Sequence, residues 1–93
     1  MLKSVQNLVN DARDGMMASR YGNHSFNRNN GLCYFRYHDA PVCVVNFDNK
    51  TVSYSYCGYE GAPSTTRTVR SYQEVFKSYR EVGREQHTGD QRR

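Results

Sequence analysis

A chain of 93 residues is expected to fold as a single domain with a small core and little room for a deep catalytic cleft. Its net charge of +4 comes mainly from arginine, so nucleic acid is a natural partner, although a solvated basic surface has the same composition. No stretch approaches the roughly 20 apolar residues of a membrane span, and the N-terminus lacks the apolar core of a signal peptide. Three cysteines, an odd number, then indicate reduced thiols in a cytosol.

The first predicted element is an amphipathic helix over residues 2–19. Apolar side chains recur there at spacings of three and four, which places them on one stripe of a helix. The stripe consists of Leu2, Val5, Val9, Ala12 and Met16. Residues 20–31 follow as a polar connector rich in Asn, Gly and Ser, residue types that favour turns. Twelve residues is a long connector for so small a domain, so a functional or mobile loop is expected.

Three strands are predicted next, over residues 32–37, 41–47 and 51–57, because β-branched and aromatic residues dominate these runs. Their short connectors favour an antiparallel meander. If Asn49-Lys50 is a tight turn, Val45 faces Tyr54 and Cys43 faces Tyr56. The opposite face would then carry Tyr34, Arg36, Val42, Val44, Asn46, Ser53 and Ser55.

A second amphipathic helix is predicted over residues 65–82, with Gly83 as its stop. Its apolar stripe is Val69, Tyr72, Phe76 and Tyr79. The predicted fold class is therefore α+β, in the order α-β-β-β-α, with a three-stranded meander and both helices on one face. Residues 1–83 would form one compact domain, and residues 84–93, which contain no apolar side chain, a disordered polar tail.

The sequence predicts neither an enzyme nor a metal or cofactor site. None of the spacings between the three cysteines and three histidines matches CxxC or HxxxH, which are typical of zinc sites. Cys33 and Cys43 are instead expected to face the core as small apolar residues. His38 adjoins Asp39, but both lie in a predicted turn, and no nucleophile with a positioned base can be identified.

A candidate phosphate site lies where the Gly58–Thr66 loop runs into the second helix. One of three consecutive hydroxyls is expected to cap this helix, whose free N–H groups carry partial positive charge. Arg67 and Arg70 follow in the first turns, where positive charge opposes the helix dipole and so does not serve stability. The predicted phosphate-binding set is Ser64, Thr65, Thr66, Arg67, Arg70, Lys77 and Arg80.

A second candidate surface is the strand face turned away from the helices. Tyr34 beside Arg36 could stack a nucleic-acid base, although a half-buried packing role is the commoner use of such a tyrosine. Val42 and Val44 on the same predicted face suggest that a dimer mate, a host protein or the 20–31 loop covers it.

Several short motifs resemble a small, uncharacterised family encoded by tailed bacteriophages. They are the Tyr37-His38 turn, the Gly58-Tyr59 pair, the Thr65-Thr66-Arg67 helix start and the Gly22-Asn23 pair. The chain departs from the family pattern in a longer loop after Tyr59 and in the helix, where Thr68–Tyr72 stands in place of an Arg-Leu-Asn run. The resemblance implies a protein made in the cytoplasm of an infected bacterium and implies no reaction.

Two functional hypotheses follow. The first is a small phage-encoded binding protein that contacts nucleic-acid phosphates through the basic helix start; the double-stranded-RNA-binding domain has the same element order, a topological analogy only. The second is a host-takeover or anti-defence inhibitor that binds a bacterial protein, in the manner of an anti-CRISPR. A homodimer through the second strand face is compatible with either.

Overall fold

The computed structural model describes residues 2–82 and is a mixed α+β fold, as predicted. The sheet has six strands in the order β1-β2-β3-β4-β5-β6, where a three-stranded meander was expected. All neighbours are antiparallel except β5 and β6, which are parallel. The elements are α1 (Lys3–Arg13), β1 (Ala18–Tyr21), β2 (His24–Asn29), β3 (Leu32–Tyr37), β4 (Ala40–Asn46), β5 (Thr51–Tyr54), α2 (Pro63–Val75) and β6 (Arg80–Glu81).

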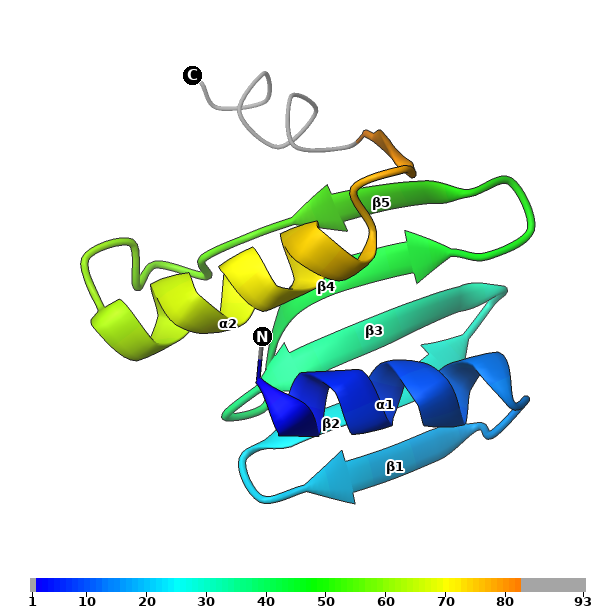
Figure 1. Ribbon diagram of the computed structural model, residues 1–93, viewed down its shortest axis with the longest axis horizontal. Helices are drawn as coiled ribbons and strands as arrows, with labels where there is room; N and C mark the ends of the chain where they lie inside the picture. Colours follow the sequence, from blue (N-terminus) through cyan, green and yellow to red (C-terminus); the bar gives the residue numbers. More distant parts are fainter. Residues whose placement is uncertain (1, 83–93) are drawn as a thin grey trace.

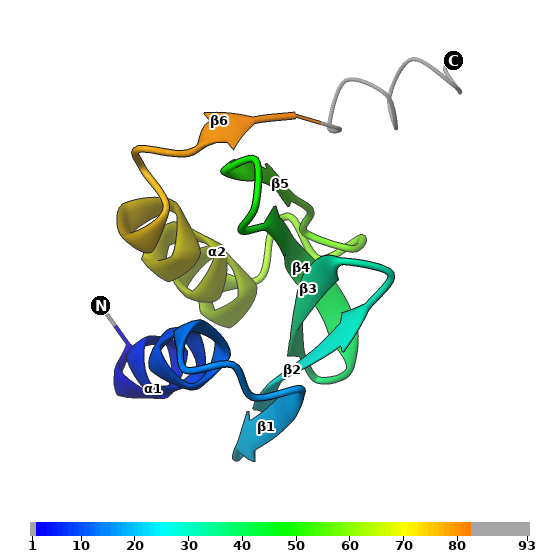
Figure 2. The ribbon, with the colours of Figure 1, turned by 90° about the vertical axis from the view of Figure 1, so that its right-hand side faces the viewer.

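Both helices cover one face of the sheet and leave the other face free of helices (Figures 1 and 2). This arrangement agrees with the prediction. The core lies between the two layers and includes Cys33 and Cys43, which are buried as predicted. In the described part of the chain no helix is long and apolar enough to cross a membrane.

The prediction of a polar connector over residues 20–31 is wrong, because this segment forms most of the β1–β2 hairpin. Tyr21 pairs with His24 across the two-residue turn Gly22-Asn23, in which Gly22 has a φ of 64°. The next turn, Asn30-Gly31, has φ values of 54° and 80°. Two-residue hairpin turns need such positive φ, which glycine and asparagine adopt at low cost. The residues interpreted as loop formers are therefore the turns of two hairpins.

The predicted helix over residues 2–19 is too long, because α1 ends at Arg13. Gly15 adopts a φ of 93°, and two backbone bonds close the end: Gly15 donates to Ala12 and Met16 donates to Asp11, both at 3.1 Å. This pattern is a Schellman motif, which satisfies the last carbonyl groups of a helix. Met16 consequently lies outside the stripe and is exposed, and β1 begins two residues later.

The predicted pairing of β4 with β5 is wrong by two residues: Cys43 faces Tyr54, and Val45 faces Val52. The turn has four residues, because the Asn46 side chain accepts hydrogen bonds from the backbone N–H groups of Asp48 and Asn49 and reverses the chain early. A shift of two preserves which side chains share a face. The predicted core face of these strands is therefore confirmed.

Val42 is the residue for which the predicted face is wrong. The β3–β4 register shifts between Phe35 and Arg36, so that Phe35 faces Cys43 while Arg36 faces Pro41. Val42 is the extra residue of this β-bulge, and a bulge re-aims the side chain at its position. It is only 1% exposed and belongs to the hydrophobic core, so it is not part of a partner face.

The second helix ends at Val75, well before the predicted residue 82. The chain then turns, and β6 adds to the edge of β5: Arg80 donates to the Lys50 carbonyl at 3.0 Å, and Val82 donates to the Val52 carbonyl at 2.7 Å. Pairing the otherwise free edge of β5 satisfies its backbone groups, which a longer helix would not do. Gly83 and the predicted tail over residues 84–93 lie outside the described residues.

Candidate nucleic-acid interface

The N-terminus of α2 begins without the side-chain cap that the sequence predicts. Ala62 is the N-cap residue, Pro63 occupies the first turn, and no hydroxyl bonds to a free backbone N–H. The helix starts before the three hydroxyls because proline fits the first helical position, where its missing N–H costs nothing. The prediction that Ser64, Thr65 or Thr66 caps the helix is therefore wrong.

The three hydroxyl residues also separate from one another in space. Ser64 and Thr65 line a small pocket with Tyr37, His38 and Tyr59, and Thr65 is only 5% exposed. Thr66 lines a different, shallow hollow on the outer side of α2. Thr66 alone of the three therefore shares a surface with the two arginines.

Arg67 and Arg70 form the basic centre of that outer hollow, with Thr66 and Ser71 beside them and Glu74, which pairs with Lys77, also in its lining. Both arginine side chains are exposed, and neither has an ion pair or hydrogen bond from its side chain within residues 2–82. The first turn of α2 contains no acidic residue. Because α2 begins at Pro63, Arg67 and Arg70 lie beyond its first turn, and the predicted conflict with the helix dipole does not apply to them. Two neighbouring guanidinium groups without an ion pair still make a local field that favours anions.

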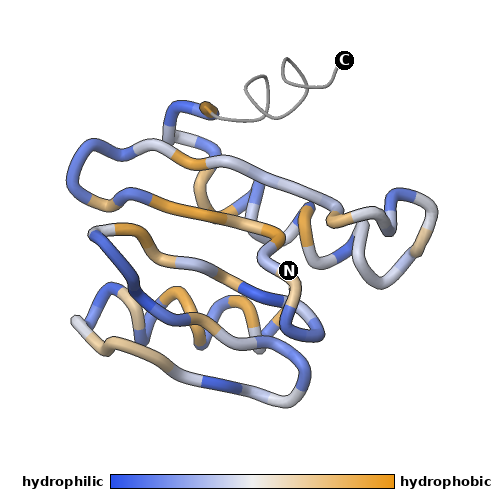
Figure 3. Tube along the Cα trace, turned by 180° about the vertical axis from the view of Figure 1, so that it is seen from behind, coloured by the Kyte–Doolittle hydropathy of each residue, from blue (hydrophilic) through white to orange (hydrophobic). Residues whose placement is uncertain are grey.

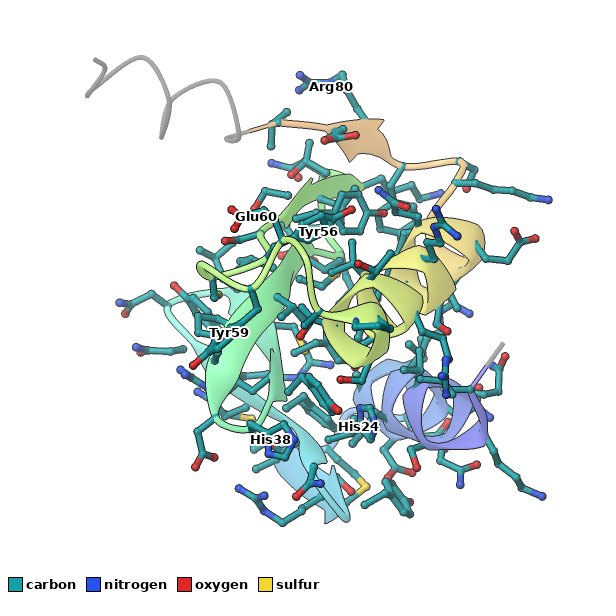
Figure 4. The ribbon with its side chains drawn as sticks, turned by 90° about the vertical axis from the view of Figure 1, so that its left-hand side faces the viewer. His24, His38, Tyr56, Tyr59, Glu60 and Arg80 are labelled. Atoms are coloured by element: carbon teal, nitrogen blue, oxygen red, sulfur yellow. The ribbon has the colours of Figure 1, made fainter. Side chains whose placement is uncertain are left out.

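Lys77 and Arg80 do not extend this basic set. The Lys77 ammonium lies 3.6 Å from the Glu74 carboxylate, so its charge is balanced locally. Arg80 belongs to β6 and is in register with Thr51, which places it on the helix-free face of the sheet. In Figure 4 its side chain points away from the helices. The predicted phosphate-binding set therefore does not form one continuous surface.

Sequence reasoning missed the pocket at the other side of the α2 N-terminus. Its volume is about 220 Å³, and Tyr59, 60% exposed, lies at its rim with His38 (Figure 4). His24 stacks on Tyr37 beside it with ring centroids 4.9 Å apart. Burial, together with the charge of His38, lowers the pKa of His24. The positive φ values of His38 and Asp39 create this rim, and no pattern of the sequence marks it.

The helix-free face retains three of the four residues of the predicted partner face. Tyr34 and Val44 are half-buried neighbours on β3 and β4, and the Arg36 guanidinium lies 5.8 Å from the centroid of the Tyr34 ring. Figure 3 views this face, with the strands in front of both helices. A groove of about 460 Å³ runs along it past Leu32, Tyr34 and Val44.

The thiols offer no nucleophile in the core. Burial raises the pKa of Cys33 to about 12, and that of Cys43 well above its usual value. Both side chains therefore stay protonated near neutral pH and pack as apolar groups.

Comparisons with protein-family models, curated proteins and solved structures gave no match. The resemblance to a phage family therefore stays a prediction.

Proposed function

We propose that this protein is a small, non-enzymatic binding protein that holds nucleic-acid phosphates on the outer side of α2. The observation that carries the proposal is that Arg67 and Arg70 are exposed in the same outer hollow, and neither forms an ion pair within the described chain. Lys77, just beyond the end of α2, has its charge balanced by Glu74. Two neighbouring guanidinium groups without an ion pair match a phosphate backbone.

The test is binding to duplex DNA, duplex RNA and single strands, measured by fluorescence anisotropy at several salt concentrations. We expect affinity to fall steeply with salt, because each phosphate contact releases counterions. The double variant Arg67→Ala/Arg70→Ala should weaken binding and reduce the slope of log K against log salt by about two. It should be within about 0.5 kcal/mol of the wild type in stability, since both side chains are exposed and neither forms an ion pair in the described chain.

The matched control removes two positive charges elsewhere. Lys3→Ala/Lys50→Asn has the same net charge as the arginine double variant; asparagine suits position 50, where φ is 57°. For this control we expect the same slope of log K against log salt as for the wild type. Absence of binding to every nucleic acid at low salt would refute the proposal.

The second candidate is a host-takeover or anti-defence inhibitor of a bacterial protein. It is favoured by the groove on the helix-free face, which has Leu32 and Val44 among its lining residues. Capture of a bacterial protein from nuclease-treated lysate would support it, and loss of every partner after nuclease treatment would remove it. On the resemblance alone, either function would be exercised in the cytoplasm of an infected bacterium.

A further inference from the structure

The helix-free face of the sheet presents planar side chains held in fixed positions. Tyr34 lies on β3, in the middle of the sheet, opposite Asn27 on β2 and Val44 on β4. The Arg36 guanidinium donates from Nε to the Asn27 side chain at 2.9 Å and from Nη1 to the Asp39 carbonyl at 3.1 Å. Two bonds at different atoms fix the plane of the guanidinium before any ligand arrives, which lowers the entropic cost of binding.

The Arg36 guanidinium and the Tyr34 ring make only a distant contact with each other. A distance of 5.8 Å between the Arg36 Cζ atom and the Tyr34 ring centroid is near the outer limit of a cation–π contact. The guanidinium is therefore offset from the ring rather than stacked closely on it, and Tyr34 is only partly buried. Tyrosine rings and arginine planes are the two protein groups on which single-stranded bases stack.

Positive charge extends across the whole face. Arg20 on β1, Arg36 on β3 and Arg80 on β6 span both edges and the middle of the sheet, a width of roughly 24 Å at about 4.8 Å per strand. Asp39 pairs with Arg20 at 3.2 Å and partly offsets its charge, in an exposed ion pair that a phosphate can exchange with at low cost. Arg36 and Arg80 have no carboxylate partner within residues 2–82, and Glu81 is in register with Val52 and so faces the helices.

The remaining side chains of the face favour a polar ligand. The row across the sheet through Tyr34 reads Asn27, Tyr34, Val44 and Ser53, with one aliphatic residue among amide, hydroxyl and ring. The core of a protein–protein interface is usually more apolar and less charged than this. The groove on this face also has Leu32 and Pro41 in its lining, so apolar contacts are available beside the charges. A basic surface with one stacking platform fits a polyanion with exposed planar groups.

We infer that single-stranded nucleic acid lies across the helix-free face, with bases stacked on Tyr34 and the Arg36 guanidinium and phosphates near Arg20 and Arg80. The inference rests on the proposed function and adds to it a second surface, on the side of the sheet opposite α2, and a ligand class for that surface. A duplex is excluded from this platform because its bases are already stacked on each other. A single strand presents its ring faces to the protein.

The experiment compares oligo(dT) with a duplex hairpin by fluorescence anisotropy. Tyr34→Leu removes the ring, and we expect about tenfold weaker binding of oligo(dT) with unchanged binding of the duplex. The matched control Tyr34→Phe keeps the ring and should stay within about twofold of the wild type. Arg36→Lys keeps the charge but loses the plane, so it too should weaken only the single strand.

Photo-cross-linking of the wild-type protein to a 4-thiothymidine oligonucleotide locates the strand without any variant, which covers the case in which Tyr34→Leu fails to fold. We expect adducts on the peptide that contains Tyr34. Unchanged oligo(dT) affinity in folded Tyr34→Leu, or adducts confined to α2, would overturn the inference. The proposed function would still stand if Arg67→Ala/Arg70→Ala weakened binding. Light scattering that shows a dimer broken by Tyr34→Leu would assign the face to a second copy and overturn it as well.

Discussion

The two faces of the sheet differ in what their side chains do, although they are built from alternate residues of the same strands. On the covered face Phe35 is fully buried and its ring lies 5.6 Å from that of Phe26 and 5.0 Å from that of Tyr72. Its neighbour in sequence, Tyr34, points to the helix-free face and meets only Arg36 as a ring partner among the described residues. One face holds the fold together, and the other is free to carry function.

The largest expected effect separates these two neighbours. Phe35→Ala should lower the free energy of unfolding by about 3–5 kcal/mol, because it leaves a cavity among packed rings. Tyr34→Ala should cost much less, since the side chain is only partly buried. Urea denaturation followed by circular dichroism measures both, and equal losses would contradict the division between the faces.

A smaller effect tests the bulge that moves Val42 from one face to the other. Val42→Thr places a hydroxyl in the core at a site that is 1% exposed, so we expect a loss of about 1–3 kcal/mol. The matched change Val44→Thr on the helix-free face should stay within about 0.5 kcal/mol of the wild type. If Val44→Thr were the more damaging change, the assignment of these two side chains would be reversed.

These residues also show how far the sequence predicts the fold. Alternation along β3 is regular, so the face of Phe35 follows from the pattern. The bulge interrupts that alternation in β4, and nothing in the run from Pro41 to Phe47 marks the extra residue. The pattern therefore predicts that Val42 lies on the helix-free face, whereas its side chain is in the core. The turn Asn30-Gly31 was a readable signal, since Asn-Gly is the strongest hairpin dipeptide. The polar composition around it outweighed that signal and concealed β1 and β2.

Next in size is a change that should stabilise the protein. The Tyr72 hydroxyl is buried without a hydrogen-bond partner within residues 2–82, and burial raises its pKa. Tyr72→Phe removes this unsatisfied group and should raise the free energy of unfolding by about 1 kcal/mol. The control Tyr21→Phe makes the same chemical change where the hydroxyl donates to Asp11 at 2.6 Å, and there we expect a loss. Thermal denaturation distinguishes the two signs.

The candidate site was predictable in charge but not in position. Arg67 and Arg70 are exposed together on the outer side of α2, as the helical period requires, but they lie in its interior because the helix begins at Pro63. The cap failed because Pro63 starts the helix earlier, and Arg80 moved to the sheet because edge pairing with β5 competes with helix extension. Arg20 escaped notice altogether, because β1 was interpreted as loop and its register against β2 depends on contacts distant in sequence.

The smallest effect is a dependence of stability on pH that originates at the pocket beside α2. The pKa of His24 is lowered in the folded protein, first by burial and then by the charge of His38. The unfolded chain then binds more protons, so stability should fall as pH drops below about 6.5. His24→Phe keeps a ring against Tyr37 and should flatten the dependence of Tm on pH between 5 and 7. His38→Asn, whose asparagine suits the φ of 51° at that position, should remove only a small part of the slope, because His38 is the second cause of the shift. An unchanged slope in His24→Phe would place the titrating group elsewhere in the chain.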